Sequence, residues 1–499
     1  MQDWKTLGDL KKNAYQHRSV KQELRENLMA KLAKGEPTFE GILGYEDTVI
    51  PQIERAILSG HHILLLGLRG QAKTRIARLI TQLLDDFVPA IEGTALNEDP
   101  FHPISETGKQ IIAEKGDETP IKWIPRAERY TEKLATPDVS VADLIGDLDP
   151  IKAATLKLSY SDPRVIHYGL IPRANRGIFV LNELPDLQAR IQVSLFNILE
   201  EEDIQIRGFK LRLPLDLQFI FTANPEDYTN RGSIITPLKD RIDSQIITHY
   251  PKTLEVGKAI VQQEARIAPE RKKNFPMPEL LQDLIEQTAI EARKSEYVDE
   301  KSGVSARMTI AAYETVVSAM ERRSICHQEK HPIIARITDL YSAISAITGK
   351  VELVYEGEQE GAADVAKKLI DKAIRAIFVT YYPNPESFKK KKEKAENENP
   401  FNSIVAWFMD GNYIEVDPNM AQADYEATLA KVSGLQDIVQ KYLPKLDQKL
   451  LPLMMEFTLH GLAAYSLIGK HTVENDRTTF KDLLSGMFGG EDEEEDFDF

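Results

Sequence analysis

HHILLLGLRGQAKT, residues 61–74, joins a short apolar run to a glycine-containing turn that ends in Lys73 and Thr74. Beyond it, apolar side chains recur at intervals of three and four residues from Ile76 to Leu84, which is typical of an amphipathic helix. A strand, a glycine-rich turn with Lys-Thr, and a helix are the context of a phosphate-binding loop. The segment therefore predicts a nucleotide-binding α/β domain; the alternative is a strand-to-helix turn that binds nothing.

The residue types in this turn suit ATP with Mg²⁺. Backbone N–H groups of the turn and the positive end of the helix would face the phosphates. Lys73 is expected to reach the β- and γ-phosphates, and the Thr74 hydroxyl is expected to ligate Mg²⁺. Ala72 stands where such loops usually have glycine, so its φ is expected to be negative. The other expected nucleotide contacts are Gly67, Arg69, Gly70 and Gln71.

A second apolar run, Gly177 to Leu181, ends in Asn182 and Glu183. In open α/β sheets, ligands bind at the carboxyl ends of the strands. Glu183 is expected to orient and deprotonate the attacking water. Asn182 takes the place of the usual aspartate beside Mg²⁺; its amide oxygen can accept a hydrogen bond but has no charge, which predicts weak Mg²⁺ binding or slow turnover.

A third run, Leu217 to Ala223, ends in Asn224, which is expected to position the water between Glu183 and the γ-phosphate. Before it, two short alternating runs around Gly208 predict a β-hairpin. From about residue 41 to 250, apolar runs alternate with helical patterns. This alternation predicts a parallel sheet sandwiched by helices, as in a P-loop NTPase.

The order of these motifs resembles AAA+ ATPases of the helix-2-insert branch, and more closely the magnesium chelatase ATPase subunit and MoxR-type ATPases. The resemblance covers about residues 40–380. It depends on the phosphate loop, on Asn182-Glu183, on Thr222-Ala223-Asn224-Pro225 and on Leu238-Lys239-Asp240-Arg241. Residues 42–46, 91–100, 144–149, 167–171 and 174–177 are also similar to segments of this family.

This resemblance implies further roles and partners. Arg241 matches the position of an arginine finger that would act on the γ-phosphate of a neighbouring subunit, with Arg231 as a second candidate. Arg307 matches the sensor-2 arginine, a phosphate contact. The resemblance therefore implies a homo-oligomeric ring, expected to be a hexamer. It also implies a protein client, which could have a von Willebrand A-type domain.

Pattern and resemblance together divide the chain into six parts. They predict, in order, an N-terminal helical arm (1–40), the AAA+ nucleotide-binding α/β domain (41–250), a helical lid (251–383), a charged linker (384–400), a mostly helical C-terminal region (401–485) and an acidic disordered tail (486–499).

Composition excludes several classes of function. The 62 basic and 78 acidic residues give a net charge of −16, which argues against a broad nucleic-acid surface. One cysteine, Cys326, excludes a disulfide framework and a multi-thiolate zinc site, and His327 and His331 near it are expected to be surface residues. No run has the length of a membrane span and the first residues do not resemble a signal peptide, so a cytoplasmic location is expected.

Four functions remain open at this stage. The first is an ATP-hydrolysing motor that remodels a partner protein, and the second is metal insertion into a porphyrin held by a partner. The third is an ATP-dependent binding switch with little or no hydrolysis, favoured by Asn182 and Ala72. An enhancer-binding transcription activator ranks last, because the sequence has no Gly-Ala-Phe-Thr-Gly-Ala loop.

Overall fold

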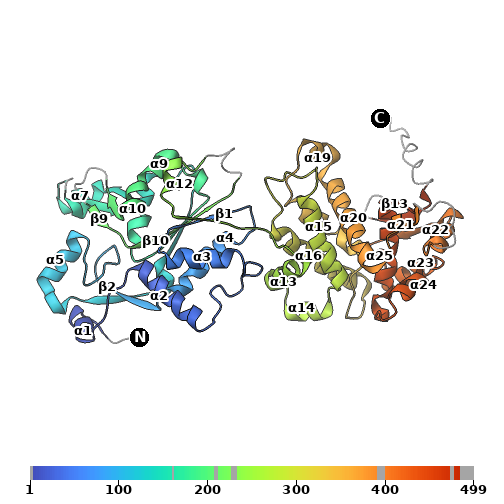
Figure 1. Cartoon of the computed structure of the whole chain (residues 1–499), viewed down its shortest axis with the longest axis horizontal. Helices are drawn as coiled ribbons and strands as arrows, with labels where there is room; N and C mark the ends of the chain where they lie inside the picture. Colours follow the sequence, from blue (N-terminus) through green and yellow to red (C-terminus); the bar gives the residue numbers. More distant parts are fainter. Residues whose placement is uncertain are drawn as a thin grey trace. The chain divides into compact units, whose positions relative to one another are not determined.

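The computed structural model describes residues 4–159, 162–206, 212–225, 233–389, 399–472 and 477–483. The chain forms two compact units, Met1–Tyr250 and Pro251–Phe499 (Figure 1). Most of the stretch 384–400 and the whole of 486–499, the expected linker and acidic tail, lie outside the described residues.

The first unit is built on a five-stranded sheet in the order β11-β1-β10-β7-β4, and all its pairs are parallel. The strands are β1 (Ile63–Leu66), β4 (Tyr130–Leu134), β7 (Gly177–Asn182), β10 (Leu217–Ala223) and β11 (Ser244–Ile247). Leu66 pairs with both Ala223 and Ile247. The residues that follow β1, β7 and β10 therefore meet at one edge of the sheet.

Helices cover both faces of this sheet. Alternate residues of each strand point to opposite sides, and apolar side chains on both sides pack against helices. Figure 1 shows α3 and α4 on one side of β1 and α9 and α12 on the other. On the first side, Ile63, Val180 and Ile220 pack with α2 (Val20–Ala33), α3 (Val49–Leu58) and α4 (Lys73–Leu79). On the second, Phe179, Phe219 and Phe221 pack with α9 (Ala189–Ser194), α10 (Phe196–Glu200) and α12 (Thr236–Asp240). The predicted sheet sandwiched by helices is confirmed.

The remaining elements of the first unit extend from this sandwich. Helix α1 (Leu7–Lys12) precedes α2, whose Leu24 and Leu28 are buried, whereas Leu32 is exposed. Three antiparallel pairs follow: β2 (Phe87–Ile91) with β3 (Ile121–Pro125), β5 (Gly146–Leu148) with β6 (Ile166–Tyr168), and β8 (Asp203–Gln205) with β9 (Arg212–Pro214). The last is the predicted hairpin, and its turn lies outside the described residues. The helices between these strands are α5 (Glu106–Lys115), α6 (Val141–Leu144), α7 (Pro150–Leu156) and α8 (Leu170–Arg173).

The second unit is mostly helical and has one continuous core that runs from Val261 to Phe480. Its helices are α13 (Leu254–Glu264), α14 (Pro269–Asn274), α15 (Glu279–Arg293), α16 (Ala306–His327), α17 (Ile337–Tyr341), α18 (Ile344–Thr348), α19 (Tyr355–Glu360), α20 (Ala362–Tyr381), α21 (Glu386–Lys389), α22 (Asn402–Met409), α23 (Gln422–Ala430), α24 (Leu435–Tyr442) and α25 (Leu451–Ala464). An antiparallel sheet of β12 (Ile414–Val416), β14 (Thr478–Lys481) and β13 (Gly469–Thr472) completes it. The expected subdivision into a lid and a separate C-terminal region stays a prediction.

Two observations concern the classes of function considered above. Among the described residues, no helix is long and apolar enough to cross a membrane. Cys326 is exposed, and His331 stacks edge-on against the Phe275 ring at 5.0 Å between centroids.

The buried His62 makes the stability of the first unit depend on pH. Its side chain accepts a hydrogen bond from the Phe219 N–H (3.2 Å), and burial lowers its pKa from 6.5 to about 3. Below pH 6.5 the histidine therefore becomes protonated in the unfolded chain but stays neutral in the folded chain. The contribution of His62 to the free energy of unfolding is fully present above pH 6.5 and decreases as the pH falls towards 3. We expect a loss of about 1.4 kcal/mol per pH unit in this window.

Urea unfolding between pH 6.5 and pH 4.5 measures this effect. The slope should be smaller in His62→Leu and unchanged in His167→Leu, which replaces an exposed histidine of the same unit. Equal slopes in wild type and His62→Leu would show that His62 does not cause the dependence.

Candidate functional site

The loop between β1 and α4 is held in place from three directions. A Cβ on Gly67 would lie 1.9 Å from Thr248 Oγ1 and 2.3 Å from Gln71 Oε1, so only glycine fits there. The Thr248 hydroxyl donates to Gln71 Oε1 (2.6 Å), and the Tyr45 hydroxyl donates to the carbonyl of Gln71 (3.1 Å). Burial raises the pKa of Tyr45 to about 12, so this hydroxyl keeps the proton that it donates. The loop is therefore positioned before any ligand binds.

Lys73 opens α4, and its side chain turns back into the loop. Its exposed fraction is 7%, and its ammonium donates to the Leu68 carbonyl (3.0 Å), to the Gly67 carbonyl and to Asn224 Oδ1 (2.7 Å). The predicted strand–loop–helix order is thus present, and the lysine lies where the loop meets the end of β10. The half-buried Thr74 follows it in the first turn of α4.

The expectation of a negative φ at Ala72 is wrong. Ala72 is the N-cap of α4 and has φ 58° and ψ 13°, in the left-handed region. The chain has already turned through Gly70 at φ 74° and must reverse once more to start the helix at Lys73. The methyl group of alanine is small enough for this conformation, at a cost of about 1–2 kcal/mol.

We expect Ala72→Gly to remove this strain and to raise the free energy of unfolding by up to about 1 kcal/mol, because the flexibility of glycine offsets part of the gain. A β-branched valine should lower it instead. Urea unfolding of the two variants beside wild type gives the order, and a valine variant as stable as the glycine variant would contradict the left-handed conformation.

The polar residues after β7 and β10 lie beside the lysine. Asn224 Nδ2 donates to Glu183 Oε2 (2.9 Å), and Asn224 Oδ1 accepts from Lys73. A hydrogen-bonded series therefore joins Lys73, Asn224 and Glu183, three residues that the sequence places far apart. Glu183 has φ 55° and ψ 49°, and its N–H donates to Thr222 Oγ1 (3.2 Å). Strained backbone of this kind is concentrated at functional sites.

Asn182 is oriented by its neighbours on both adjacent strands. Its Oδ1 accepts from the Thr222 hydroxyl (3.0 Å), and its Nδ2 donates to Glu132 Oε1 (2.7 Å). Sequence reasoning missed Glu132, which lies on β4 opposite Val180. It therefore shares the sheet face with α4, whose Arg78 donates to Glu132 Oε2 (3.0 Å). The structure thus brings a carboxylate next to the asparagine that replaces the usual aspartate.

The contacts of Glu132 keep it ionised. Burial alone raises the pKa of Glu132, but hydrogen bonds from Arg78, Tyr130 and Asn182 and the charge of Arg78 outweigh burial, so the pKa is lowered. Arg78 follows Thr74 by four residues, so both are on one face of α4. Glu132 therefore contacts the face of α4 that also contains Thr74. The sequence signal that could have found it is an acidic residue in the middle of the strand Tyr130–Leu134.

The hydrogen bonds of Arg241 are made with residues outside this series. Arg241 is the C-cap of α12. Its Nε donates to Glu200 Oε2 (2.7 Å), and its guanidinium lies 4.8 Å from the centre of the Phe196 ring. Arg307 is exposed in the first turn of α16, in the second unit. Arg231 lies outside the described residues. Arg69 is exposed, and its carbonyl accepts from the Tyr250 hydroxyl (3.2 Å).

Residues 155–247 match the sequence model of a protein family, the Sigma-54 interaction domain, which is an AAA+ domain. This span contains Glu183, Asn224 and Arg241. Together with the parallel sheet, the match confirms the predicted α/β fold of the AAA+ P-loop type. No curated protein matches the chain.

Several solved structures are similar to this chain at low identity. A model of the complex between subunits BchI and BchD of magnesium chelatase is 18% identical over 64% of this chain and 98% of that chain, with a TM-score of 0.33. NtrX from Brucella abortus in complex with ATP is 14% identical over 58% of this chain and 52% of that chain (TM-score 0.33). A RuvB variant from Thermotoga maritima is 11% identical over 80% of this chain and 99% of that chain (TM-score 0.35). At TM-scores this low, none of them bears on activity, and the finer resemblance to chelatase and MoxR-type ATPases stays a prediction.

Proposed function

We propose that this chain binds ATP with Mg²⁺ at the loop between β1 and α4, hydrolyses it, and uses the reaction to remodel a partner protein. The observation that carries the proposal is the hydrogen-bonded series Lys73–Asn224–Glu183. It joins the lysine of a phosphate loop, the amide at the end of one strand and the carboxylate at the end of the next. These are the groups that phosphoryl transfer to water requires.

The chemistry of the site fits a magnesium nucleotide. The Gly67 position leaves no space for a side chain, and Lys73 is buried with its ammonium turned into the loop. When bound, ATP and Mg²⁺ supply the phosphoanhydride bond and a cation that neutralises its charge. The cation would be held by the Thr74 hydroxyl, with Asn182 and Glu132 beside it to bind its water shell.

The residues of the chain then have separate tasks. Lys73 binds phosphate oxygens by charge and hydrogen bonds. Asn224 orients the attacking water, and Glu183 takes its proton. The hydrogen bond between Asn224 Nδ2 and Glu183 Oε2 keeps the acceptor oxygen of the base in one direction.

We assign Arg241 to a neighbouring copy of the chain, in a ring expected to be a hexamer. In the single chain Arg241 is held by Glu200 and Phe196, so it would have to leave this ion pair to reach another subunit's γ-phosphate. Arg307 is proposed as a further phosphate contact from the second unit. A protein client, with a von Willebrand A-type domain as the expected kind, would receive the resulting motion. Metal insertion into a porphyrin held by such a partner is a variant of this proposal.

A binding switch without hydrolysis is the second candidate. It is favoured by the neutral Asn182, whose oxygen is already engaged by Thr222. The match to the Sigma-54 interaction domain favours an enhancer-binding activator, but the sequence has no Gly-Ala-Phe-Thr-Gly-Ala loop, so this function ranks last.

ATP binding and phosphate release by the purified full chain test the proposal. We expect Mg²⁺-dependent release by wild type, and ATP binding weakened about 10- to 100-fold in Lys73→Ala, because a charge-assisted contact is lost. Lys109→Ala, at an exposed lysine of α5, is the control. A wild type that binds no ATP would overturn the proposal, and one that binds ATP without releasing phosphate would support the switch.

A further inference from the structure

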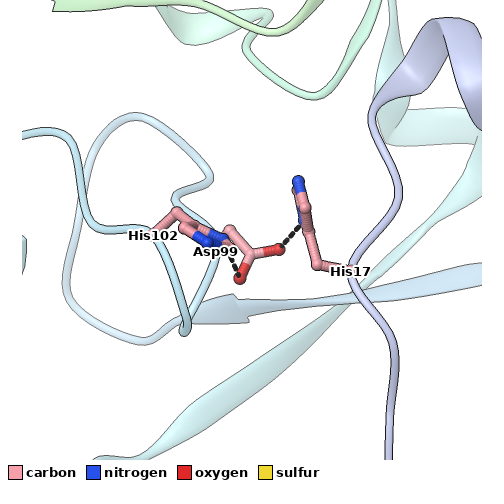
Figure 2. Close-up of side chains that lie close together, drawn as sticks. All are labelled: His17, Asp99 and His102. Carbon is pink, nitrogen blue, oxygen red and sulfur yellow. Dashed lines mark hydrogen bonds and ion pairs between the residues drawn. The ribbon is translucent and has the colours of Figure 1, made fainter.

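We propose that His17, Asp99 and His102 form a site for one divalent transition-metal ion, with Zn²⁺ as the fitting occupant (Figure 2). One ligand atom from each residue lies within 4.8 Å of the other two. His17 Nδ1 is 2.5 Å from Asp99 Oδ2, and His102 Nδ1 is 4.0 Å from Asp99 Oδ1. One carboxylate oxygen thus faces each imidazole, and the two ring centres are 4.8 Å apart (Figure 2).

The three donors are those that zinc prefers. Two imidazoles and one carboxylate, with water in the fourth position, make a tetrahedral Zn²⁺ site, whose donor atoms are about 3.3 Å apart. To reach this spacing, His102 must move closer to Asp99, and the hydrogen bond of 2.5 Å between His17 and Asp99 must lengthen. The His102 side chain is 67% exposed, so it has room to turn. His17 is 32% exposed, which leaves a path for the ion and its water.

The carboxylate is fixed before an ion arrives. Asp99 is 4% exposed, and its Oδ1 accepts from the N–H of Phe101 (2.6 Å). Its backbone carbonyl accepts from the N–H of His102 (3.1 Å), which keeps the two ligands of this loop together. Hydrogen bonds of this kind orient the ligands of metal sites.

The charges around Asp99 are largely paired with one another. Arg176 Nη2 is 3.5 Å from Asp99 Oδ2, and its charge would by itself repel a metal ion. Behind it, Arg129 forms a bidentate pair with Glu23 (2.6 and 2.7 Å), and Asp216 adds a buried carboxylate that interacts with Arg176. Glu23 thus balances Arg129, and Asp99 and Asp216 interact with Arg176; burial raises the pKa of Asp216. A cation at the histidines would therefore be held by the Asp99 carboxylate and the two imidazoles, against the charge of Arg176 alone.

A bound ion would connect two distant parts of the first unit. His17 lies in the segment between α1 and α2, and Asp99 and His102 lie in the loop between β2 and α5, 82 residues later. An ion that binds only the folded chain raises its stability in proportion to its occupancy. The site would therefore fasten the N-terminal segment to this loop, independently of the nucleotide site.

The test uses the metal-stripped full chain without ATP, titrated with Co²⁺ as a spectroscopic probe and with Zn²⁺ by calorimetry. We expect one ion per chain, the visible absorption of tetrahedral Co²⁺, and an unfolding temperature raised by about 3 °C or more at saturating Zn²⁺. His102→Ala, which removes an exposed ligand without disturbing the core, should weaken binding at least about 10-fold.

His17→Ala should act like His102→Ala, and His167→Ala, at another exposed histidine, should bind as wild type does. Undiminished binding in His102→Ala, or no stoichiometric binding by wild type below about 100 µM Zn²⁺, would overturn the site. Phosphate release by His102→Ala is expected to equal that of wild type, so failure of the metal site and failure of the nucleotide site give different results.

Discussion

Glu183→Gln is expected to lower phosphate release about 100-fold or more while ATP still binds. General-base catalysis contributes about 10²- to 10⁴-fold, and glutamine has no basic oxygen to take the proton of the water. The amide oxygen of the introduced glutamine can still accept the hydrogen bond from Asn224 Nδ2, so the geometry of the site is retained. Steady-state phosphate release and ATP binding, measured on the same preparation, separate the two effects.

Glu201→Gln is the matched control, because Glu201 is an exposed glutamate of the same unit. Equal rates in wild type and Glu183→Gln would refute the assignment of the base. The same variant, with ATP, also serves to capture the client, since a subunit that binds but does not hydrolyse ATP stays in one state. A stable partner that elutes when ATP is removed would support remodelling.

Glu132→Gln is expected to raise the Mg²⁺ concentration required for half-maximal phosphate release by about 10- to 100-fold. One charged hydrogen-bond acceptor contributes about 1.5–3 kcal/mol, and in the proposed site Glu132 supplies the charge that Asn182 lacks. Asn182→Asp alone should also impair the protein, because two carboxylates would then replace a hydrogen bond of 2.7 Å.

The double variant should rescue both defects. In Glu132→Gln with Asn182→Asp, the amide and the carboxylate exchange strands, and the hydrogen bond between them is restored with the charge on the more usual residue. A double-mutant cycle on the Mg²⁺ requirement measures this coupling. If Glu132→Gln leaves the Mg²⁺ requirement unchanged, Glu132 has only a structural role.

The fold was predictable where the signal is local. The apolar run before Gly67, the helical spacing after Lys73 and the polar ends at Asn182 and Asn224 each depend on neighbours in sequence, and the parallel sheet of the first unit follows from them. The joining of Lys73, Asn224 and Glu183 also follows, because the carboxyl ends of adjacent parallel strands meet at one edge.

What the sequence did not predict depends on contacts between distant segments or on backbone angles. The residues around Glu132 in the sequence do not indicate that β4 pairs with β7. The residues around His17 do not indicate that its side chain contacts Asp99, 82 residues later. The left-handed angle of Ala72 was mispredicted because the usual preference of alanine was applied to a position whose angle the loop imposes. The role of Arg307 as a phosphate contact stays a prediction, because Arg307 belongs to the second unit and the nucleotide loop belongs to the first.

The left-handed conformations of Ala72 and Glu183 affect how this protein would respond to selection for heat tolerance. Glycine at either position would relieve strain, so a screen that rewards survival at high temperature alone would enrich both changes. At position 72 glycine would leave the side chains of Lys73, Asn224 and Glu183 unchanged. At position 183 glycine would remove the proposed base, and the most heat-stable variants would then have lost ATP hydrolysis. Survival and turnover therefore have to be selected together.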